Sequence, residues 1–339
     1  MKVVIAPDSF KECMPSPQVA AAMAAGVRAR WTEAEVREIP LADGGEGTWE
    51  VLASALEASV SEAVVHDPLG RSVRARFAMK RDTAIIEAAQ AVGLSLLSPC
   101  ERNPLKASSA GLGELMLAAY DKGCRHFIVG LGGTATCDGG AGLLSVPGIE
   151  RLKGATIELL CDVDAPFIGP KGAARVFAPQ KGAGPEAVEV LEERMKEQAA
   201  RMLEETGVDI SHVPGAGAAG GLAGALMAVL GARITRGIDR VLDLVHFHEA
   251  IRDAHLIITG EGKSDAQTLM GKVPMGVLQN AAGIPVALLS GRIEDRTALE
   301  QAGFHSVIEV SPRHLSSQIA LTPQVAAENL FKAVIAIEW

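Results

Sequence analysis

Acidic side chains follow three short apolar runs of this sequence, at the points where β-strands are expected to end. They are Asp8, Asp43, Glu46, Glu261 and Asp265. In a parallel sheet the carboxyl ends of the strands share one edge, which is where open α/β sheets bind ligands. Any one of these acids is also typical of a turn or a helix cap. Because three separate loops supply them, we expect a functional site at this edge.

Two lysines and a serine lie close to these acids in the sequence. Ser9 and Lys11 come directly after Asp8, and Lys272 precedes a predicted helix. A lysine beside a carboxylate can bind an anionic ligand, although a single lysine is more often a solvated surface residue. We predict that Lys11 acts in catalysis and that Ser9 and Lys272 contact substrate or phosphate.

Glycine runs are the second unusual feature. Residues 130–135 match the spacing G-x-G-x-x-A and residues 215–220 match G-x-G-x-x-G, but neither run opens a leading βαβ unit. Backbone N–H groups at such helix starts can hold phosphate or carboxylate, whereas close helix packing is the alternative. The predicted contacts to substrate or phosphate are Gly44, Gly45, Glu46, Gly132, Gly133, Thr134, Thr136, Asp138, Gly215, Gly217 and Gly220.

A further acidic pair, Asp162 and Asp164, follows a predicted strand over 156–161. Strand periodicity would put both carboxylates on one face, where they repel unless a cation or a proton lies between them. We therefore predict Mg²⁺ ligands among Asp162, Asp164, Glu261 and Asp265, with a solvated turn as the alternative for the first pair.

Carboxylates, lysines and glycine loops together favour phosphoryl transfer, in which positioning and charge neutralisation supply most of the catalysis. Asp8 or Asp43 would act as the general base. The sequence contains no G-x-S-x-G motif, which argues against a hydrolase with a nucleophilic serine. A nicotinamide-dependent oxidoreductase of a small hydroxy acid, using residues 130–135, is the alternative.

Composition excludes several other classes of protein. The 339 residues carry a net charge of −9, which disfavours nucleic acid as a partner. The uncharged stretch 213–232 contains Pro214 and six glycines, so we expect a buried loop and helix and no membrane span. Five scattered cysteines without a C-x-x-C pair are typical of reduced thiols in a cytoplasmic protein.

The order of predicted elements indicates an α/β protein of two domains. Strands over 3–6, 36–41, 256–258, 286–289 and 307–310, separated by helices, predict a flavodoxin- or Rossmann-like parallel sheet. Between them, runs over 60–65, 72–79 and 83–88 predict antiparallel strands of a mixed α/β domain. We expect residues 1–60 with 236–339 to form the first domain and residues 61–235 to be inserted as the second.

In chain order, the motifs resemble those of the bacterial glycerate kinase family that forms 2-phosphoglycerate. The matching segments are 6–11, 42–47, 102–105, 132–142, 161–164, 179–183, 214–221 and 259–262. The resemblance implies an ATP- and Mg²⁺-dependent kinase of D-glycerate in glycerate, glucarate and glyoxylate catabolism. It also implies a flavodoxin-like domain, an inserted domain and an active site in the cleft between them. Lys181, in the segment 179–183, joins the predicted contacts to substrate or phosphate, and homo-oligomer formation stays open.

One departure from the family concerns the segment after Leu144. The family continues there with a long strand, a loop and a glycine-rich segment, whereas here residues 145–151 lead almost directly to the strand at 156. A few dozen residues are absent. A catalytically impaired homologue of the kinase is therefore a second alternative.

Overall fold

The computed structural model describes residues 1–266, 268–313 and 315–338, and the chain forms two compact units. The first unit combines residues 1–43 with 238–339, and the second unit is continuous over 44–237. Residues 44–60, which the sequence assigned to the first domain, cluster with the second unit. The reason is that helix α2 (Thr48–Ala55) packs on strands β4 (Ser72–Lys80) and β5 (Thr83–Glu87) of that unit.

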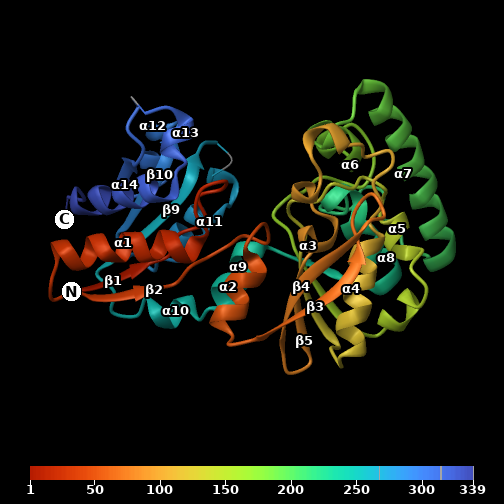
Figure 1. The fold of residues 1–339 in the computed structure, drawn as a ribbon, viewed down its shortest axis with the longest axis horizontal. Helices are drawn as coiled ribbons and strands as arrows, with labels where there is room; N and C mark the ends of the chain where they lie inside the picture. Colours follow the sequence, from red (N-terminus) through yellow and green to blue (C-terminus); the bar gives the residue numbers. More distant parts are fainter. Residues whose placement is uncertain (267, 314, 339) are drawn as a thin grey trace. The chain divides into compact units, whose positions relative to one another are not determined.

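A five-stranded parallel sheet forms the centre of the first unit (Figure 1). Its order is β11-β10-β9-β1-β2, which in chain order within the unit is the flavodoxin-like order 2-1-3-4-5. The strands are β1 (Lys2–Ile5), β2 (Glu35–Glu38), β9 (Leu256–Ser264), β10 (Val286–Ile293) and β11 (Ser306–Glu309). Successive strands are added on one side of β1 and then, from β9 onward, on the other, and ligands bind at such a switch point in this type of fold.

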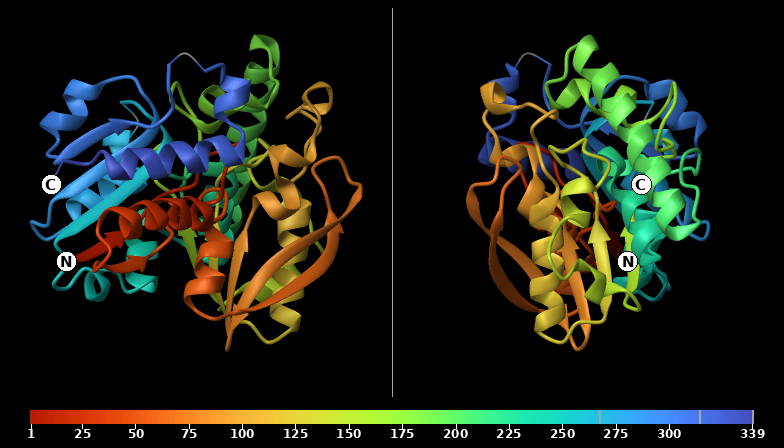
Figure 2. Two further views of the ribbon diagram at one scale, coloured as in Figure 1. Left: turned by 60° about the vertical axis from the view of Figure 1, so that its left-hand side comes forward. Right: turned by 90° about the vertical axis from the view of Figure 1, so that its right-hand side faces the viewer.

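Apolar runs buried on both faces explain why these segments form central strands. Ile5 and Ile258 pack with helices α1 and α14, whereas the alternate residues Val4 and Ile257 are equally buried on the other face. Helices α1 and α14 lie side by side (Figures 1 and 2). The helices of this unit are α1 (Ser16–Arg30), α9 (Gly237–Leu244), α10 (Phe247–Ala250), α11 (Val273–Gln279), α12 (Arg296–Gln301), α13 (Ser317–Ala320) and α14 (Pro323–Ile335).

Strand β9 is longer than the sequence predicted. Pairing with β10 continues from Ile257 to Ser264, so Glu261 lies inside the strand and does not follow it. Gly260 allows the two strands to pair closely because it has no side chain: a Cβ at this position would lie 2.2 Å from the carbonyl oxygen of Leu289 and clash with it.

The second unit contains a six-stranded mixed sheet in the order β3-β4-β5-β6-β7-β8. Strands β3, β4 and β5 pair antiparallel, as the sequence predicted, and β5 to β8 pair parallel. The strands are β3 (Ser59–His66), β4 (Ser72–Lys80), β5 (Thr83–Glu87), β6 (His126–Gly130), β7 (Thr156–Leu160) and β8 (Arg233–Thr235). An α/β fold with a parallel sheet and a second, mixed sheet is thus confirmed.

Helices build the two apolar cores of this unit. Leu112, Leu115 and Leu226 pack with the sheet, and a second core forms where α7 meets α6 and α8. Besides α2, the helices are α3 (Ala89–Val92), α4 (Ala110–Asp121), α5 (Ala141–Leu144), α6 (Ala173–Phe177), α7 (Pro185–Thr206) and α8 (Leu222–Leu230). The uncharged stretch 213–232 holds α8 and a buried loop, as predicted. Of the described helices, none is long and apolar enough to cross a membrane.

The connection between β6 and β7 contains the segment after Leu144, which the sequence predicts to be short for the family it resembles. After α5 the chain makes a short turn and a 3-10 helix (Ile149–Leu152), whose Ile149 and Leu152 are buried in the core. Strand β7 then pairs with both β6 and β8. The short connection therefore closes the core and leaves the sheet continuous.

Candidate functional site

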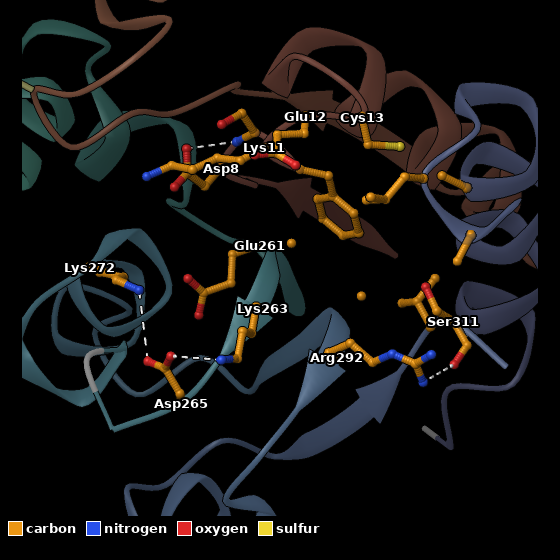
Figure 3. Close-up of a pocket in the computed structure, with 18 residues that line it drawn as sticks. Asp8, Lys11, Glu12, Cys13, Glu261, Lys263, Asp265, Lys272, Arg292 and Ser311 are labelled. Atoms are coloured by element: carbon orange, nitrogen blue, oxygen red, sulfur yellow. Dashed lines mark hydrogen bonds and ion pairs between the residues drawn. The ribbon is translucent and has the colours of Figure 1, made fainter. Parts of the chain in front are cut away.

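The first unit contains a cavity of about 420 Å³ beside the ends of β1 and β9 (Figure 3). This volume lies within the usual range for small-molecule sites. Six of the predicted site residues line it: Asp8, Ser9, Lys11, Glu261, Asp265 and Lys272. The cavity therefore lies where this strand order places a ligand.

Asp8 is the most perturbed acid of this cavity. Main-chain pairing continues past β1, since the Asp8 N–H donates to the carbonyl of Gly260 at 2.8 Å, and this holds the side chain in place. The carboxylate accepts a hydrogen bond from the Ser9 N–H at 2.7 Å. Burial and the nearby charge of Asp43 raise the pKa of Asp8 to about 8, against the opposing effects of Ser9 and Lys11. Asp8 can therefore exchange a proton near neutral pH.

Glu261 projects from the inside of β9 and is 4% exposed. Its Oε1 accepts hydrogen bonds from the hydroxyls of Ser264 and Thr268, at 2.8 and 2.5 Å. Burial raises the pKa of Glu261, whereas the two hydroxyls oppose the shift. Asp8, Asp43 and Glu261 come from three adjacent strands and interact electrostatically, so the structure brings these three predicted acids together.

Asp265 lies between two lysines at the edge of the cavity. Its carboxylate is 3.7 Å from the ammonium of Lys263 and 3.8 Å from that of Lys272 (Figure 3). Lys263 is also paired with Glu294 at 2.7 Å. Lys272 precedes α11 as its N-cap residue, so its predicted place at a helix start is observed.

A tight loop carries Ser9 and Lys11 into the cavity. Phe10 and Met14 exchange two backbone hydrogen bonds of 2.8 Å, which close the loop over residues 10–14. The hydroxyl oxygen of Ser9 is buried without a hydrogen-bond partner in the described part of the chain. A buried hydroxyl in this state gains free energy when a ligand supplies the missing bond.

In the second unit, the loop 44–47 packs directly against the first glycine run. A Cβ on Gly130 would lie 2.7 Å from the Gly44 carbonyl oxygen, and one on Gly132 would lie 2.5 Å from Gly45 Cα. The Gly132 N–H donates to the Gly44 carbonyl, and that of Gly44 donates to Thr48 Oγ1. Close packing thus explains these glycines, and anion binding by Gly44, Gly45 and Gly132 stays a prediction.

Glu87 is a buried acid beside this loop that the sequence analysis missed. It ends β5, is 2% exposed, and its Oε2 accepts the Gly47 N–H at 3.1 Å. Burial raises the pKa of Glu87 to about 7, although the N–H groups of Gly47 and Trp49 oppose the shift. Glu46, which the sequence did single out, is exposed. The sequence signal that could have identified Glu87 is its position as an acid at the end of an apolar strand.

The second glycine run is also packed tightly. A Cβ on Gly217 would lie 2.2 Å from the Pro166 carbonyl oxygen, and one on Gly220 would lie 2.1 Å from that of Thr136. The Gly217 N–H is bonded to Ala165. A side chain on Gly215 would meet Ile234. The packing alternative is therefore observed here, and no anion contact of this run is tested.

Lys181 is a cation buried to 97% in the second unit, near the first glycine run. Its ammonium donates to Thr134 Oγ1 at 3.1 Å and to the Thr136 carbonyl at 2.7 Å. Burial lowers the pKa of Lys181 to about 8. The hydroxyl of Thr136 is buried with no partner in the described residues. A carboxylate or phosphate would suit Lys181 and the Thr136 hydroxyl. Gly133, in the same run, has a positive φ of 72° and packs against Ala89, and its contact with an anion stays a prediction.

Asp138 is saturated with hydrogen bonds from the chain itself. Its Oδ2 accepts from the N–H and the hydroxyl of Ser109 and from the Gly142 N–H, and its Oδ1 accepts from the Gly140 N–H. The carboxylate therefore ties the start of α4 to the start of α5. A ligand contact by Asp138 stays a prediction.

Asp162 and Asp164 differ from the expected geometry. Strand β7 ends at Leu160, so both acids lie in irregular backbone, where strand periodicity no longer sets their side chains on one face. Asp162 Oδ1 accepts the Gly237 N–H at 2.9 Å. These two acids belong to the second unit, whereas Glu261 and Asp265 belong to the first. Among the described residues, no group of three or more potential ligands forms a ready metal site.

A family model, curated relatives and a solved structure all match this chain to glycerate kinases. The model of the glycerate kinase family matches residues 3–153 and 145–338. Glycerate kinase of Bacillus subtilis is 40% identical over 92% of this chain and 91% of the relative, and glycerate 2-kinase of Escherichia coli is 39% identical over 91% and 90%. A crystal structure assigned to glycerate kinase 2 of Salmonella typhimurium LT2 has a TM-score of 0.85 and 38% identity, covering 99% of this chain and 96% of that one.

The same comparisons bear on the short connection after Leu144. The family match consists of two segments, residues 3–153 and 145–338, which overlap over residues 145–153. Alignment with glycerate kinase of Bacillus cereus extends over 364 positions, more than the 339 residues of this chain, so that relative has residues without a counterpart here. That these residues fall after Leu144 stays a prediction.

Proposed function

Because the chain belongs to the glycerate kinase family, we propose that it transfers the γ-phosphate of ATP to the 2-hydroxyl of D-glycerate. The products are 2-phosphoglycerate and ADP. The observation that carries this proposal is Asp8, a buried carboxylate with a pKa of about 8, in a cavity that Lys11 and Lys272 also line. An acid beside cations suits the transfer of an anionic group to a hydroxyl.

In the proposed reaction, Asp8 takes the proton of the attacking hydroxyl. The hydroxyl oxygen bonds to the γ-phosphorus as the bond from that phosphorus to the β-γ bridging oxygen breaks, and the leaving oxygen stays on ADP. Lys11 and Lys272 offset the negative charge of the phosphates, and the unpartnered Ser9 hydroxyl donates a hydrogen bond to the bound anion. Burial, together with the nearby charge of Asp43, keeps the pKa of Asp8 high enough for proton capture.

Glu261 and Asp265 fit a magnesium ion bound together with ATP. Mg²⁺ prefers oxygen ligands and commonly uses one or two carboxylates with substrate phosphates, so a ready cluster of three protein ligands is unnecessary. The hydroxyls of Ser264 and Thr268 orient the Glu261 carboxylate, as outer groups do for metal ligands. When bound, the ion neutralises charge on the phosphates. Asp162 and Asp164 remain predicted ligands without such support.

The proposal also covers location and assembly. The five cysteines of the described chain are all free thiols, which favours the cytoplasm. Formation of homo-oligomers stays a prediction that sedimentation can test.

The experiment is a coupled assay of ADP release by the purified full chain with ATP, Mg²⁺ and D-glycerate. We expect release that depends on D-glycerate, and phosphorus NMR of the product should show 2-phosphoglycerate. L-glycerate and omission of the acceptor are the controls. A folded protein that releases no ADP in response to D-glycerate, or whose product is 3-phosphoglycerate, would contradict the proposal.

A further inference from the structure

The cavity of the first unit has two chemically different ends. Asp8, Glu261 and Lys272 lie on one side of it, whereas Cys13, Arg292 and Ser311 lie on the other (Figure 3). This second side also includes the apolar residues Val310 and Leu321, contributed by the chain after β11 and after α13. We call it the apolar end of the cavity.

The strand order sets the length of the cavity. Its lining begins at β1 and passes β9 and β10 to the chain just after β11, which is three strand spacings. At nearly 5 Å per spacing this is about 14 Å. A ligand that fills the cavity is therefore elongated, with one end among charged groups and the other against apolar side chains.

Arg292, the cation at the apolar end, is already paired by the chain. Arg292 donates to Glu309 at 3.1 Å and to the Ser311 carbonyl at 3.4 Å. The Arg292 guanidinium is therefore less available to bind an anionic ligand than the Lys11 ammonium at the opposite end. Phe10, which is 5% exposed, extends the apolar lining from the loop that carries Lys11.

Leu321 is an apolar side chain that the fold leaves 42% exposed at this end. Covering it with a flat aromatic ligand removes apolar surface from water and is favourable. From the elongated shape, the charged end and this apolar end, we propose that the cavity binds ATP in one orientation, with the nucleobase against Phe10, Val310 and Leu321 and the phosphates toward Lys11 and Lys272. The inference rests on the proposed function for the identity of the nucleotide.

The test compares ATP with inorganic tripolyphosphate, which carries the phosphates but no base. Binding of each is measured by calorimetry in the presence of Mg²⁺, for the unaltered protein, Leu321→Asp and Ile319→Asp. Ile319 is a matched control because it is 50% exposed on α13 but does not line the cavity. We expect Leu321→Asp to weaken ATP about tenfold or more while tripolyphosphate changes less than about twofold. Ile319→Asp should change neither.

Two results would overturn the inference: equal ATP affinity for the two variants, or equal losses for ATP and tripolyphosphate in Leu321→Asp. Circular dichroism of each variant establishes that it is folded. Glycerate-dependent turnover, measured separately, distinguishes the two proposals. Turnover with unaltered ATP affinity in Leu321→Asp refutes only the base position, whereas the expected binding pattern without turnover refutes only the kinase assignment.

Discussion

Asp8 of the first unit and Asp138 of the second follow parallel strands of their own sheets, yet their carboxylates accept very different numbers of hydrogen bonds. In the described part of the chain, a single N–H, that of Ser9, bonds to the Asp8 carboxylate, and Asp43 and Glu261 repel its charge. Asp138 accepts four hydrogen bonds from Ser109, Gly140 and Gly142.

Hydrogen bonding, more than position after a strand, separates the reactive acids of this protein from its structural ones. A carboxylate with several donors has little to gain from a ligand, and its charged form stabilises the fold. A buried carboxylate with few donors and negative neighbours holds its proton near neutral pH and is suited to proton transfer. Three substitutions test this distinction, in order of expected effect.

Asp8→Asn should reduce kcat by about 10³-fold, since it removes the proposed proton acceptor. ATP affinity should be retained. In the unaltered protein, kcat/KM should rise with pH up to about 8, where Asp8 loses its proton, and Asp8→Asn should lose this limb. Steady-state kinetics from pH 6 to 9, with calorimetry for ATP, check both.

The same variant has a second readout in stability. The folded-state pKa of Asp8 lies above the ordinary value of 3.8, so its folded form binds the proton more tightly. Its contribution to stability is therefore greatest below that value and is lost as pH rises toward 8. Asp8→Asn should make the protein more stable than the parent above pH 8. Unaltered kcat, or a stability loss at that pH, would argue against the assigned role.

Asp138→Ala should lower the free energy of unfolding by roughly 4 kcal/mol, because it leaves the donors of Ser109, Gly140 and Gly142 without their acceptor. Turnover per folded molecule should be unchanged. Urea denaturation and kinetics measure the two effects. The control is Asp121→Ala, which removes an exposed ion pair with Arg151 and should change the free energy of unfolding far less. A raised KM in the folded fraction would instead support the predicted ligand contact of Asp138.

Glu87→Gln should remove a pH dependence of stability in the second unit. The folded-state pKa of Glu87, about 7, lies above the ordinary 4.5, so the parent loses roughly 3 kcal/mol of stability as pH rises between these values. Gln can still accept the Gly47 N–H and stays neutral. Thermal unfolding at pH 5 and pH 8 measures the change, with Glu197→Gln, at an exposed position of α7, as the control. Parallel pH curves for Glu87→Gln and the parent would show that Glu87 is not the titrating group.

Much of the fold could be predicted because local patterns dictate it. The run 3–6 was expected as a buried strand and is β1, and the helix expected from Pro185 to Glu205 is α7 (Pro185–Thr206). Such predictions depend on apolar periodicity and on residues such as Gly and Pro at element ends. The length of β9 could not be read in this way, because Glu261 interrupts its apolar run and only pairing with β10 extends the strand.

By itself, the sequence determined the family, the α/β class, the parallel and antiparallel segments and the set of candidate acids and lysines. These follow from residue types and spacing, which are local properties of the chain. Only the tertiary structure decided that Asp8 is short of hydrogen bonds, that Asp138 is saturated and that Glu87 is buried. It also showed that Asp162 and Asp164 lie beyond their strand. The reason is physical: hydrogen bonding, burial and pKa depend on groups far away in the sequence, which the folded chain brings together.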